Sequence, residues 1–293
     1  MLLQKSYTRS EMNIYNWSKV EEIFFEKQII KDQNTRIPYL LIDNFPDLGL
    51  IVSLRFLEWV FENPKGVISL PTGKTPEYFI KWTHYLLNNW DDSRVEQILK
   101  KHGFSTKDKP DLSKLTFVQI DEFYPLDPSQ QNSFSNYVSK YYLSGFNIPF
   151  GNALLINAND IKLYGGEHYS KIFPEGIINL NLRHKDPTNQ LEEKQQESLF
   201  LIDQWCNEYE KKIRDLGGIG FFLGGIGPDG HIAFNVRGSD HNSTTRLMAT
   251  NFETQAAAAT DLGGIEVSGN RLVITIGLGT ITYNKNATAI IIA

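Results

Sequence analysis

The stretch "YEKKIRDLGGIGFFLGGIGPDGHIAFN" (residues 209–235) joins the end of a helical pattern, an apolar run and a glycine-rich turn. Basic residues and then glycine close the helical pattern, as they commonly do at helix C-termini. The apolar run is typical of a buried strand. The order helix, strand and polar turn predicts an α/β fold in which Asp229 and His231 follow a strand.

Other strand and helix signals alternate along the chain in the same way. Apolar runs predict further strands at 66–71, 115–120, 152–157, 271–279 and 287–292. Helical spacing of apolar residues predicts helices from Pro76 to about Trp90 and over 198–217. Apolar strands separated by helices indicate a mostly parallel sheet with helices on both faces.

The chain length fits one α/β domain preceded by a short extension. Residues 1–45 precede the first clear strand unit and are expected to pack as an N-terminal extension on a main domain of residues 46–293. The most polar stretch, 181–198, is expected to be a mobile surface insertion in that domain.

Composition and charge narrow the classes of partner. A hydrophobic content of 41% predicts a buried core, and a net charge of −5 argues against nucleic acid or an anionic membrane as a standing partner. Such a charge still permits a small anionic metabolite. No apolar run reaches membrane-spanning length, no signal peptide is apparent, and the single cysteine, Cys206, fits a reducing compartment. The expected protein is soluble and cytoplasmic.

Three polar stretches fall at the ends of predicted strands: "PTGKTP" (71–76), "DEFYPL" (121–126) and "GGIGPDGH" (224–231). The carboxyl ends of parallel strands share one edge of a sheet, where ligands bind. We therefore expect Thr72, Asp121 and His231 to line one pocket.

Each of these stretches also has a simpler interpretation. The Thr-Gly turn before Pro76 offers backbone N–H groups and a hydroxyl for a phosphate, or is an ordinary strand-to-helix turn. Asp121 caps a turn, or removes a proton from a carbon next to a carbonyl. His231 is structural, or it is an acid–base group that Asp229 orients. No histidine, cysteine or carboxylate cluster has metal-ligand spacing, so no metal is expected.

Taken together, "LPTGKTP", "DEFYPL" with "NSFSNYVSKYYL", "GIGPDGHIAFN" and "LVITIGLGTI" resemble the glucosamine-6-phosphate deaminase (isomerase) family, whose relatives include 6-phosphogluconolactonases. The resemblance covers roughly residues 65–293, and "GIGPDGHIAFN" is its most specific part. It implies a Rossmann-like α/β domain of the type found in ribose-5-phosphate isomerase and CoA transferases. It also implies a sugar phosphate as ligand, no cofactor, and assembly into homo-oligomers.

The resemblance further implies a role for individual residues. Asp121 would move a proton between C2 and C1 of the sugar, and His231, oriented by Asp229, would open the pyranose ring. The residues expected to hold the sugar phosphate are Thr72, Gly73, Lys74 and Thr75. The remaining residues expected around the substrate are Glu122, Gly225, Gly227, Gly230, Asn235 and Arg246.

The sequence departs from the family pattern at three places. Val236 stands where deaminases usually carry a glutamate, and valine neither moves protons nor orients a histidine. Thr260 aligns with an arginine that holds phosphate in the family, and Arg237 and Arg246 are candidates to replace that charge. The chain stops after "ATAIIIA", before a further phosphate-binding lysine, which is expected of a piece of a longer protein.

The expected activity is conversion of glucosamine 6-phosphate, or a related amino-sugar phosphate, to a ketose phosphate and ammonia. A lactonase is the nearest alternative, but lactonases typically have "DER" where this chain has "DEF" ending in Phe123. A non-catalytic domain that binds sugar phosphates is the second alternative, and Val236 favours it.

Overall fold

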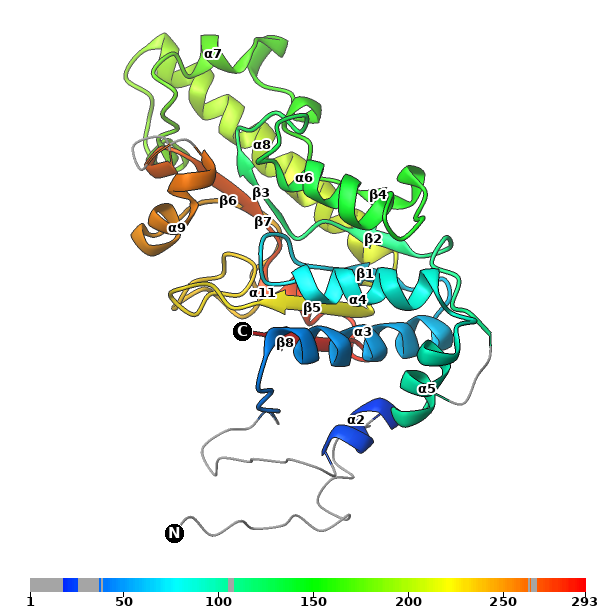
Figure 1. Cartoon of the computed structure of the whole chain (residues 1–293). Helices are drawn as coiled ribbons and strands as arrows, with labels where there is room; N and C mark the ends of the chain where they lie inside the picture. The colour runs from blue at the N-terminus through cyan, green and yellow to red at the C-terminus, as the bar shows by residue number, and fades with distance from the viewer. Residues whose placement is uncertain (1–17, 26–36, 38, 105–107, 263, 265–267) are drawn as a thin grey trace, which may run out of the picture. The chain divides into compact units, whose positions relative to one another are not determined.

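The computed structural model describes residues 18–25, 37, 39–104, 108–262, 264 and 268–293 (Figure 1). The described residues form two compact units. Of the described residues, unit 1 takes in those from 18 to 64 and from 76 to 112, and unit 2 takes in those from 65 to 75 and from 113 to 293. Much of the expected N-terminal extension lies outside the described residues, so its boundary at residue 45 stays a prediction. No helix among the described residues is long and apolar enough to cross a membrane.

Unit 1 is helical. Its helices are α2 (Lys19–Phe25), α3 (Phe45–Glu62), α4 (Glu77–Asn88) and α5 (Ser93–Lys101). Helix α3 begins after Asn44, whose side chain accepts a hydrogen bond from the Asp47 N–H at 2.9 Å. α3 and α4 lie side by side (Figure 1), and Ser53 Oγ of α3 donates to the Phe79 carbonyl of α4 at 2.8 Å. Helix α4 is the helix that the sequence predicts from Pro76 to about Trp90.

Unit 2 contains a five-stranded, fully parallel sheet. Its strands are β1 (Val67–Ser69), β2 (Thr116–Val118), β4 (Ala153–Leu154), β5 (Phe221–Gly225) and β8 (Thr288–Ile292). Their order in the sheet is β4-β2-β1-β5-β8. The prediction of an α/β fold with a mostly parallel sheet is confirmed.

A second, antiparallel sheet was not expected. It contains β3 (Asp121–Tyr124), β7 (Leu272–Thr275) and β6 (Arg246–Ala249) in the order β3-β7-β6. The late strand expected in the parallel sheet at 271–279 lies here instead. The chain leaves β2 after Val118 and enters β3 at Asp121, and the Gln119 side chain spans the turn. Its amide donates to the Asp121 carbonyl at 2.8 Å and accepts from the Ile156 N–H at 2.9 Å.

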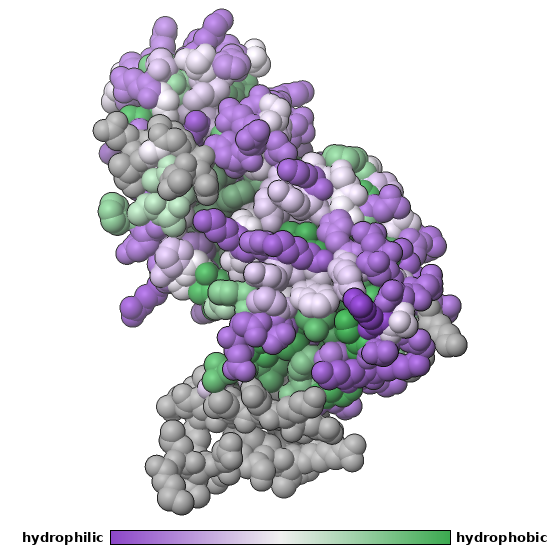
Figure 2. Space-filling view, in the orientation of Figure 1, coloured by the Kyte–Doolittle hydropathy of each residue, from purple (hydrophilic) through white to green (hydrophobic). Residues whose placement is uncertain are grey.

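The prediction of a mobile surface insertion at 181–198 is wrong for its second half. Residues 190–198 form the first turns of helix α8 (Gln190–Asp215). Asn189 caps it by accepting from the Glu192 N–H at 3.0 Å. Side chains of its inner face enter the core beside strand residues such as Val118 and Phe222. One of these is Cys206, and burial raises the pKa of its thiol to about 12, which fits a structural role. Figure 2 shows mainly hydrophilic residues over α7 and the start of α8.

Shorter elements complete the described part of unit 2: α6 (Phe134–Tyr137), the π-helix η1 (Val138–Leu143), the 3-10 turns η2 (Phe150–Asn152), η3 (Ala158–Asp160), η4 (Tyr164–Gly166) and η5 (Leu180–Arg183), and helices α7 (Tyr169–Ile172), α9 (Phe252–Leu262) and α11 (Leu278–Ile281).

Candidate active site

The three polar strand ends meet at one cavity within unit 2. The cavity has a volume of about 170 Å³. Its lining includes Thr72, Asp121 and His231, the three side chains expected to share a pocket. Thr75, Gly225 and Gly227 also line it. We refer to it as the Asp121 cavity. The structure places the other predicted residues outside the lining: Gly73, Lys74, Glu122, Asp229, Gly230, Asn235 and Arg246.

Asp121 is the buried carboxylate of this cavity. Asp121 is 9% exposed, and its carboxylate makes no hydrogen bond to any residue that the structure describes. Burial, and secondarily the neighbouring Glu122 carboxylate, raises the pKa of Asp121 to about 8. A carboxyl group with this pKa, facing an open space, is suited to accept and return a proton near neutral pH.

Glu122, the next residue, has a different role. Its carboxylate accepts hydrogen bonds from the Ser133 hydroxyl at 2.7 Å and from the Ser135 and Phe134 N–H groups at 2.8 and 3.1 Å. The Phe123 N–H adds a fourth at 3.0 Å. Burial raises the pKa of Glu122, and these donors oppose the rise. The side chain therefore fixes the start of α6 to β3 and has no free lone pair for a ligand in the cavity.

His231 is held by Asp229, which Asn251 holds in turn. Its Nδ1 is hydrogen-bonded to Asp229 Oδ1, and Asn251 Nδ2 donates to Asp229 Oδ2 at 2.6 Å. Burial raises the pKa of Asp229, but the bonds from His231 and Asn251 outweigh it and hold that pKa below its ordinary value. Asp229 therefore stays ionised and fixes the imidazole, so that Nε2 is the nitrogen left for a ligand.

Gly227 makes room for that imidazole. A Cβ atom at position 227 would fall within overlap distance of three ring atoms of His231. The Gly227 N–H also donates to the His231 carbonyl at 2.9 Å, which closes the turn. Gly230 completes the turn with a φ of 84°, a conformation that favours glycine. The glycines of the motif thus position His231.

The turn after His231 is strained and well supported. Ala233 and Phe234 have φ values of 50° and 47°, in the left-handed region. The Asn235 amide donates to the carbonyls of Ile232, Ala233 and Ile276 at 2.9 to 3.0 Å. This turn stacks the Phe234 ring on the His231 imidazole, with centroids 5.2 Å apart and planes at 18°. Asn235, predicted as a substrate contact, supports this turn.

The expected phosphate loop is fixed by two tyrosines. Tyr142 Oη donates to the Pro71 carbonyl at 2.5 Å, and Tyr137 Oη donates to the Gly73 carbonyl at 2.9 Å. Gly73 has a φ of 85°, which glycine adopts without strain. The loop therefore presents Thr72 and Thr75 to the cavity, while Lys74 is exposed and does not line it.

Cationic side chains are absent from the lining that the structure describes. Arg246 Nη2 donates to Asn235 Oδ1 at 2.9 Å and its Nη1 to the Thr244 carbonyl at 3.3 Å, so this guanidinium supports the strained turn. Arg237 is exposed, and the side chain of Thr260 lies outside the described residues. Across the described chain, no group of three histidine, cysteine or acidic side chains is arranged to hold a metal ion.

Comparison with known proteins places this site in context. No family model matches the chain. The chain is 42% identical over 91 residues to glucosamine-6-phosphate isomerase of Candida albicans, a stretch that is 31% of this chain and 37% of that protein. It is 28% identical over 216 residues to glucosamine-6-phosphate deaminase of Borrelia garinii, covering 72% of this chain and 74% of that protein. The deaminase of Borrelia hermsii is 29% identical over 245 residues, 82% of this chain and 69% of that protein.

The chain is similar to glucosamine-6-phosphate deaminases over most of its length, at an identity of 28% to 29%. Solved structures agree in fold. A monomeric glucosamine-6-phosphate deaminase superposes with a TM-score of 0.59 at 20% identity, covering 85% of this chain and 79% of that one. A 6-phosphogluconolactonase from Plasmodium vivax gives a TM-score of 0.50 at 15% identity, covering 94% and 81%. The resemblance inferred from the motifs is thus confirmed, whereas the roles of individual residues stay predictions.

Two residues of this site were not found from the sequence. Asn251 precedes α9 and accepts from the Thr254 N–H at 3.0 Å, so the stretch "TNFET" carried an N-cap signal. Nothing in that signal indicated that the same amide would reach Asp229. Phe234 was part of the quoted motif, but its stacking on His231 depends on the left-handed turn, which the sequence did not reveal.

Proposed function

We propose that this protein converts an amino-sugar 6-phosphate, with glucosamine 6-phosphate as the first candidate, to a ketose 6-phosphate and ammonia. One observation carries the proposal. Asp121, a buried carboxyl group with no hydrogen-bond partner among the described residues, faces the same small cavity as an imidazole, His231, held by an ionised carboxylate. That pair provides one group for proton transfer at carbon and a second for proton transfer at oxygen.

Ring opening is the step assigned to His231. The closed pyranose opens when the proton of the O1 hydroxyl leaves and a proton reaches the ring oxygen O5. An imidazole whose Nδ1 is bound by Asp229 can accept the first proton at Nε2 and deliver it to O5. Deaminases usually carry a glutamate that assists this step, where this chain has Val236. Here Asp229 and Asn251 orient His231 without it.

Isomerisation is the step assigned to Asp121. Its carboxylate removes the C2 proton of the open-chain aldose and returns it to C1, which leaves an imine at C2. Water adds to that carbon and ammonia departs, giving the ketose phosphate. Only ionised Asp121 can remove the proton, so kcat/KM should rise with pH and level off above about 8.

The loop of residues 71–75 is the proposed seat of the phosphate. It offers backbone N–H groups and the hydroxyls of Thr72 and Thr75 at the cavity wall, which suit phosphate oxygens. The lining described above has no arginine or lysine, so we expect phosphate to contribute less to affinity here than a charged clamp would.

The test uses the full chain with glucosamine 6-phosphate. Released ammonia and ketose phosphate are measured, and the reaction is repeated in deuterated water. Solvent deuterium in the ketose at C1 is expected if a carboxylate exchanges the transferred proton. Asp121→Asn should abolish both signals, whereas Asp186→Asn, an exposed acid outside the lining of this cavity, should change neither. Hydrolysis of 6-phosphogluconolactone without ammonia release would instead assign a lactonase.

A sugar-phosphate-binding domain without turnover is the second candidate. Val236, which stands in place of the glutamate usual in deaminases, favours it. It predicts saturable binding of glucosamine 6-phosphate with no ammonia from the parent chain. Binding without product, unchanged by Asp121→Asn, would replace the enzymatic proposal.

A further inference from the structure

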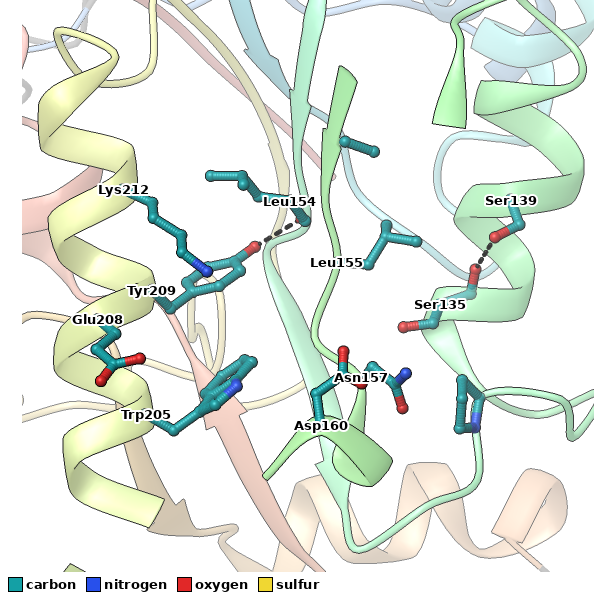
Figure 3. Close-up of a pocket in the computed structure, with 12 residues that line it drawn as sticks. Ser135, Ser139, Leu154, Leu155, Asn157, Asp160, Trp205, Glu208, Tyr209 and Lys212 are labelled. Atoms are coloured by element: carbon teal, nitrogen blue, oxygen red, sulfur yellow. Dashed lines mark hydrogen bonds between the residues drawn. The ribbon is translucent and has the colours of Figure 1, made fainter. Parts of the chain in front are cut away.

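Unit 2 contains a second and larger cavity at the edge strand β4, lined by residues of α8 and by Ser135 of α6 and Ser139 of η1. Its volume is about 520 Å³, within the range of roughly 300–1,000 Å³ typical of small-molecule sites. Figure 3 shows Trp205, Tyr209 and Lys212 reaching from α8 toward β4, with Asn157 and Asp160 nearby. We refer to it as the Trp205 cavity.

An aromatic surface forms one wall of this cavity. The rings of Trp205 and Tyr209 are stacked, with centroids 5.3 Å apart and planes at 18°. Tyr209 is buried and its hydroxyl is fixed to the carbonyls of Gln119 and Leu154 at 2.8 and 2.9 Å. Trp205 is half-buried, so the rigid Tyr209 supports an indole that remains accessible to a ligand.

Polar groups of several kinds surround that aromatic wall. They include the carboxylates of Asp160 and Glu208, the Lys212 amine, the Asn157 amide and the Ser139 hydroxyl. Within the described residues, no ion pair occupies the two carboxylates or the amine. Donors and acceptors therefore converge on the space while three charged groups remain available for a ligand.

The charge of the lining limits the ligand class. Two carboxylates against one amine disfavour a phosphate dianion. A sugar ring has an apolar face of C–H groups and hydroxyls around its edge that both donate and accept. One aromatic face combined with carboxylate, amide and amine groups matches that distribution. A nucleoside would use the aromatic face but offers fewer hydroxyls to the polar rim.

We propose that the Trp205 cavity binds an unphosphorylated monosaccharide, with its ring on the Trp205 indole and its hydroxyls on Asp160, Glu208 and Asn157. This proposal does not depend on the reaction assigned to the Asp121 cavity. The two sites would take chemically related ligands that differ in the phosphate group.

Calorimetric titration of the full chain with D-glucose and D-glucosamine tests the proposal. Inorganic phosphate and adenosine serve as comparison ligands. We expect saturable one-to-one binding of at least one sugar, and no binding of phosphate that depends on Trp205. Trp205→Ala should weaken that binding by about tenfold or more, since it removes the stacking surface. Trp82→Ala, which removes a half-buried tryptophan of unit 1, is the matched control and should leave binding unchanged.

A second variant keeps the test decisive if Trp205→Ala does not fold. The double change Asp160→Asn with Glu208→Gln alters only exposed side chains and should also weaken sugar binding several-fold, with an unchanged melting temperature. The proposal is overturned if neither sugar saturates the protein, or if both cavity variants bind sugar as the parent does. Tighter binding of adenosine or phosphate, lost in Trp205→Ala, would also overturn it.

Discussion

The two cavities of unit 2 differ in how their ionisable groups are satisfied. Next to the Asp121 cavity, Glu122 and Asp229 are bound by neighbouring donors, whereas the Asp121 carboxyl group that lines the cavity has no side-chain hydrogen bond to any described residue. In the Trp205 cavity the charged groups are exposed and face outward into a space about three times larger. A single buried group with a shifted pKa suits chemistry, whereas several exposed polar groups around an aromatic ring suit reversible binding.

The cavities nevertheless share a wall. Phe134 of α6 lines the Asp121 cavity, and the next residue, Ser135, lines the Trp205 cavity. Gln119 connects the same two sides, since its amide bonds the Asp121 carbonyl and accepts from Ser135 Oγ at 2.8 Å. Variants can therefore test whether turnover at the Asp121 cavity and sugar binding at the Trp205 cavity are independent of each other.

The largest effect is expected from Asp121→Asn. Removing the base should lower turnover of glucosamine 6-phosphate by about 10² to 10⁴-fold, the usual contribution of a general base. Ammonia release measures it. Sugar binding at the Trp205 cavity should not change by calorimetry. Turnover equal to that of the parent would make Asp121 a structural residue of β3.

Gly227→Ala should have the next largest effect on turnover. The added Cβ overlaps the His231 ring, and displacing a catalytic group by about 1 Å can lower the rate by about 10²-fold. Steady-state kinetics measures the loss. Gly151→Ala is the matched control, because a Cβ atom added there would meet no other atom within 4 Å and the φ of Gly151 is not in the left-handed region. Equal rates in both variants would mean that the imidazole takes no part in turnover.

Asp121→Asn should also stabilise the fold, and the gain should depend on pH. The pKa of Asp121 is about 8 in the folded chain and near 4 in an unfolded one. Its stabilising contribution is therefore complete below pH ~4 and is lost as the pH rises toward 8. Asparagine has no such loss, so the free energy of unfolding of the variant should exceed that of the parent by several kcal/mol near pH 8 and by little near pH 4. Denaturant unfolding at both values measures this, and a difference independent of pH would contradict a raised pKa.

Asn251→Asp should lower turnover by roughly three- to tenfold. The aspartate keeps the cap of α9 but replaces the donor to Asp229 with a second acceptor, so His231 loses part of its orientation. The loss should be larger with the closed pyranose than with an open-chain analogue, because His231 serves ring opening. Asn251→Ser retains both a cap and a donor and should recover activity. Equal losses with both substrates would show a structural effect alone.

The smallest effect is expected from Trp205→Ala on turnover, which should stay within about twofold of the parent at saturating substrate. The same protein sample should have lost sugar binding. Ammonia release and calorimetry on that sample compare the two. A large loss of turnover in a folded variant would show that the shared wall couples the cavities and that the separation drawn between them is wrong.

The sequence predicted the parallel sheet and the meeting of its strand ends because apolar runs and glycine-rich turns are local signals. It did not predict the antiparallel sheet of β3, β7 and β6. The apolar run at 115–120 continues directly into Asp121, and only the hydrogen bonds of the Gln119 side chain show where the chain changes sheets. Strand direction follows from these long-range contacts, which leave no periodic pattern in the sequence.

The site was predictable to the extent that its residues belong to one motif. Asp229 and His231 are two positions apart, so their spacing alone indicates a pair. Asn251 lies 22 residues from Asp229, and no local pattern connects them. Glu122 illustrates the opposite error. Its position beside Asp121 suggested a ligand contact, but its four donors come from the next residue and from residues 133–135, where a turn returns the chain.

The raised pKa of Asp121 has a consequence for energetics measured in solution. At neutral pH most molecules of the empty protein hold a proton on this carboxyl group, yet the proposed reaction starts from the carboxylate. Productive capture of substrate then releases a proton to the buffer. The observed binding enthalpy would accordingly vary with the ionisation enthalpy of the buffer chosen, and the slope of that dependence would count the protons released.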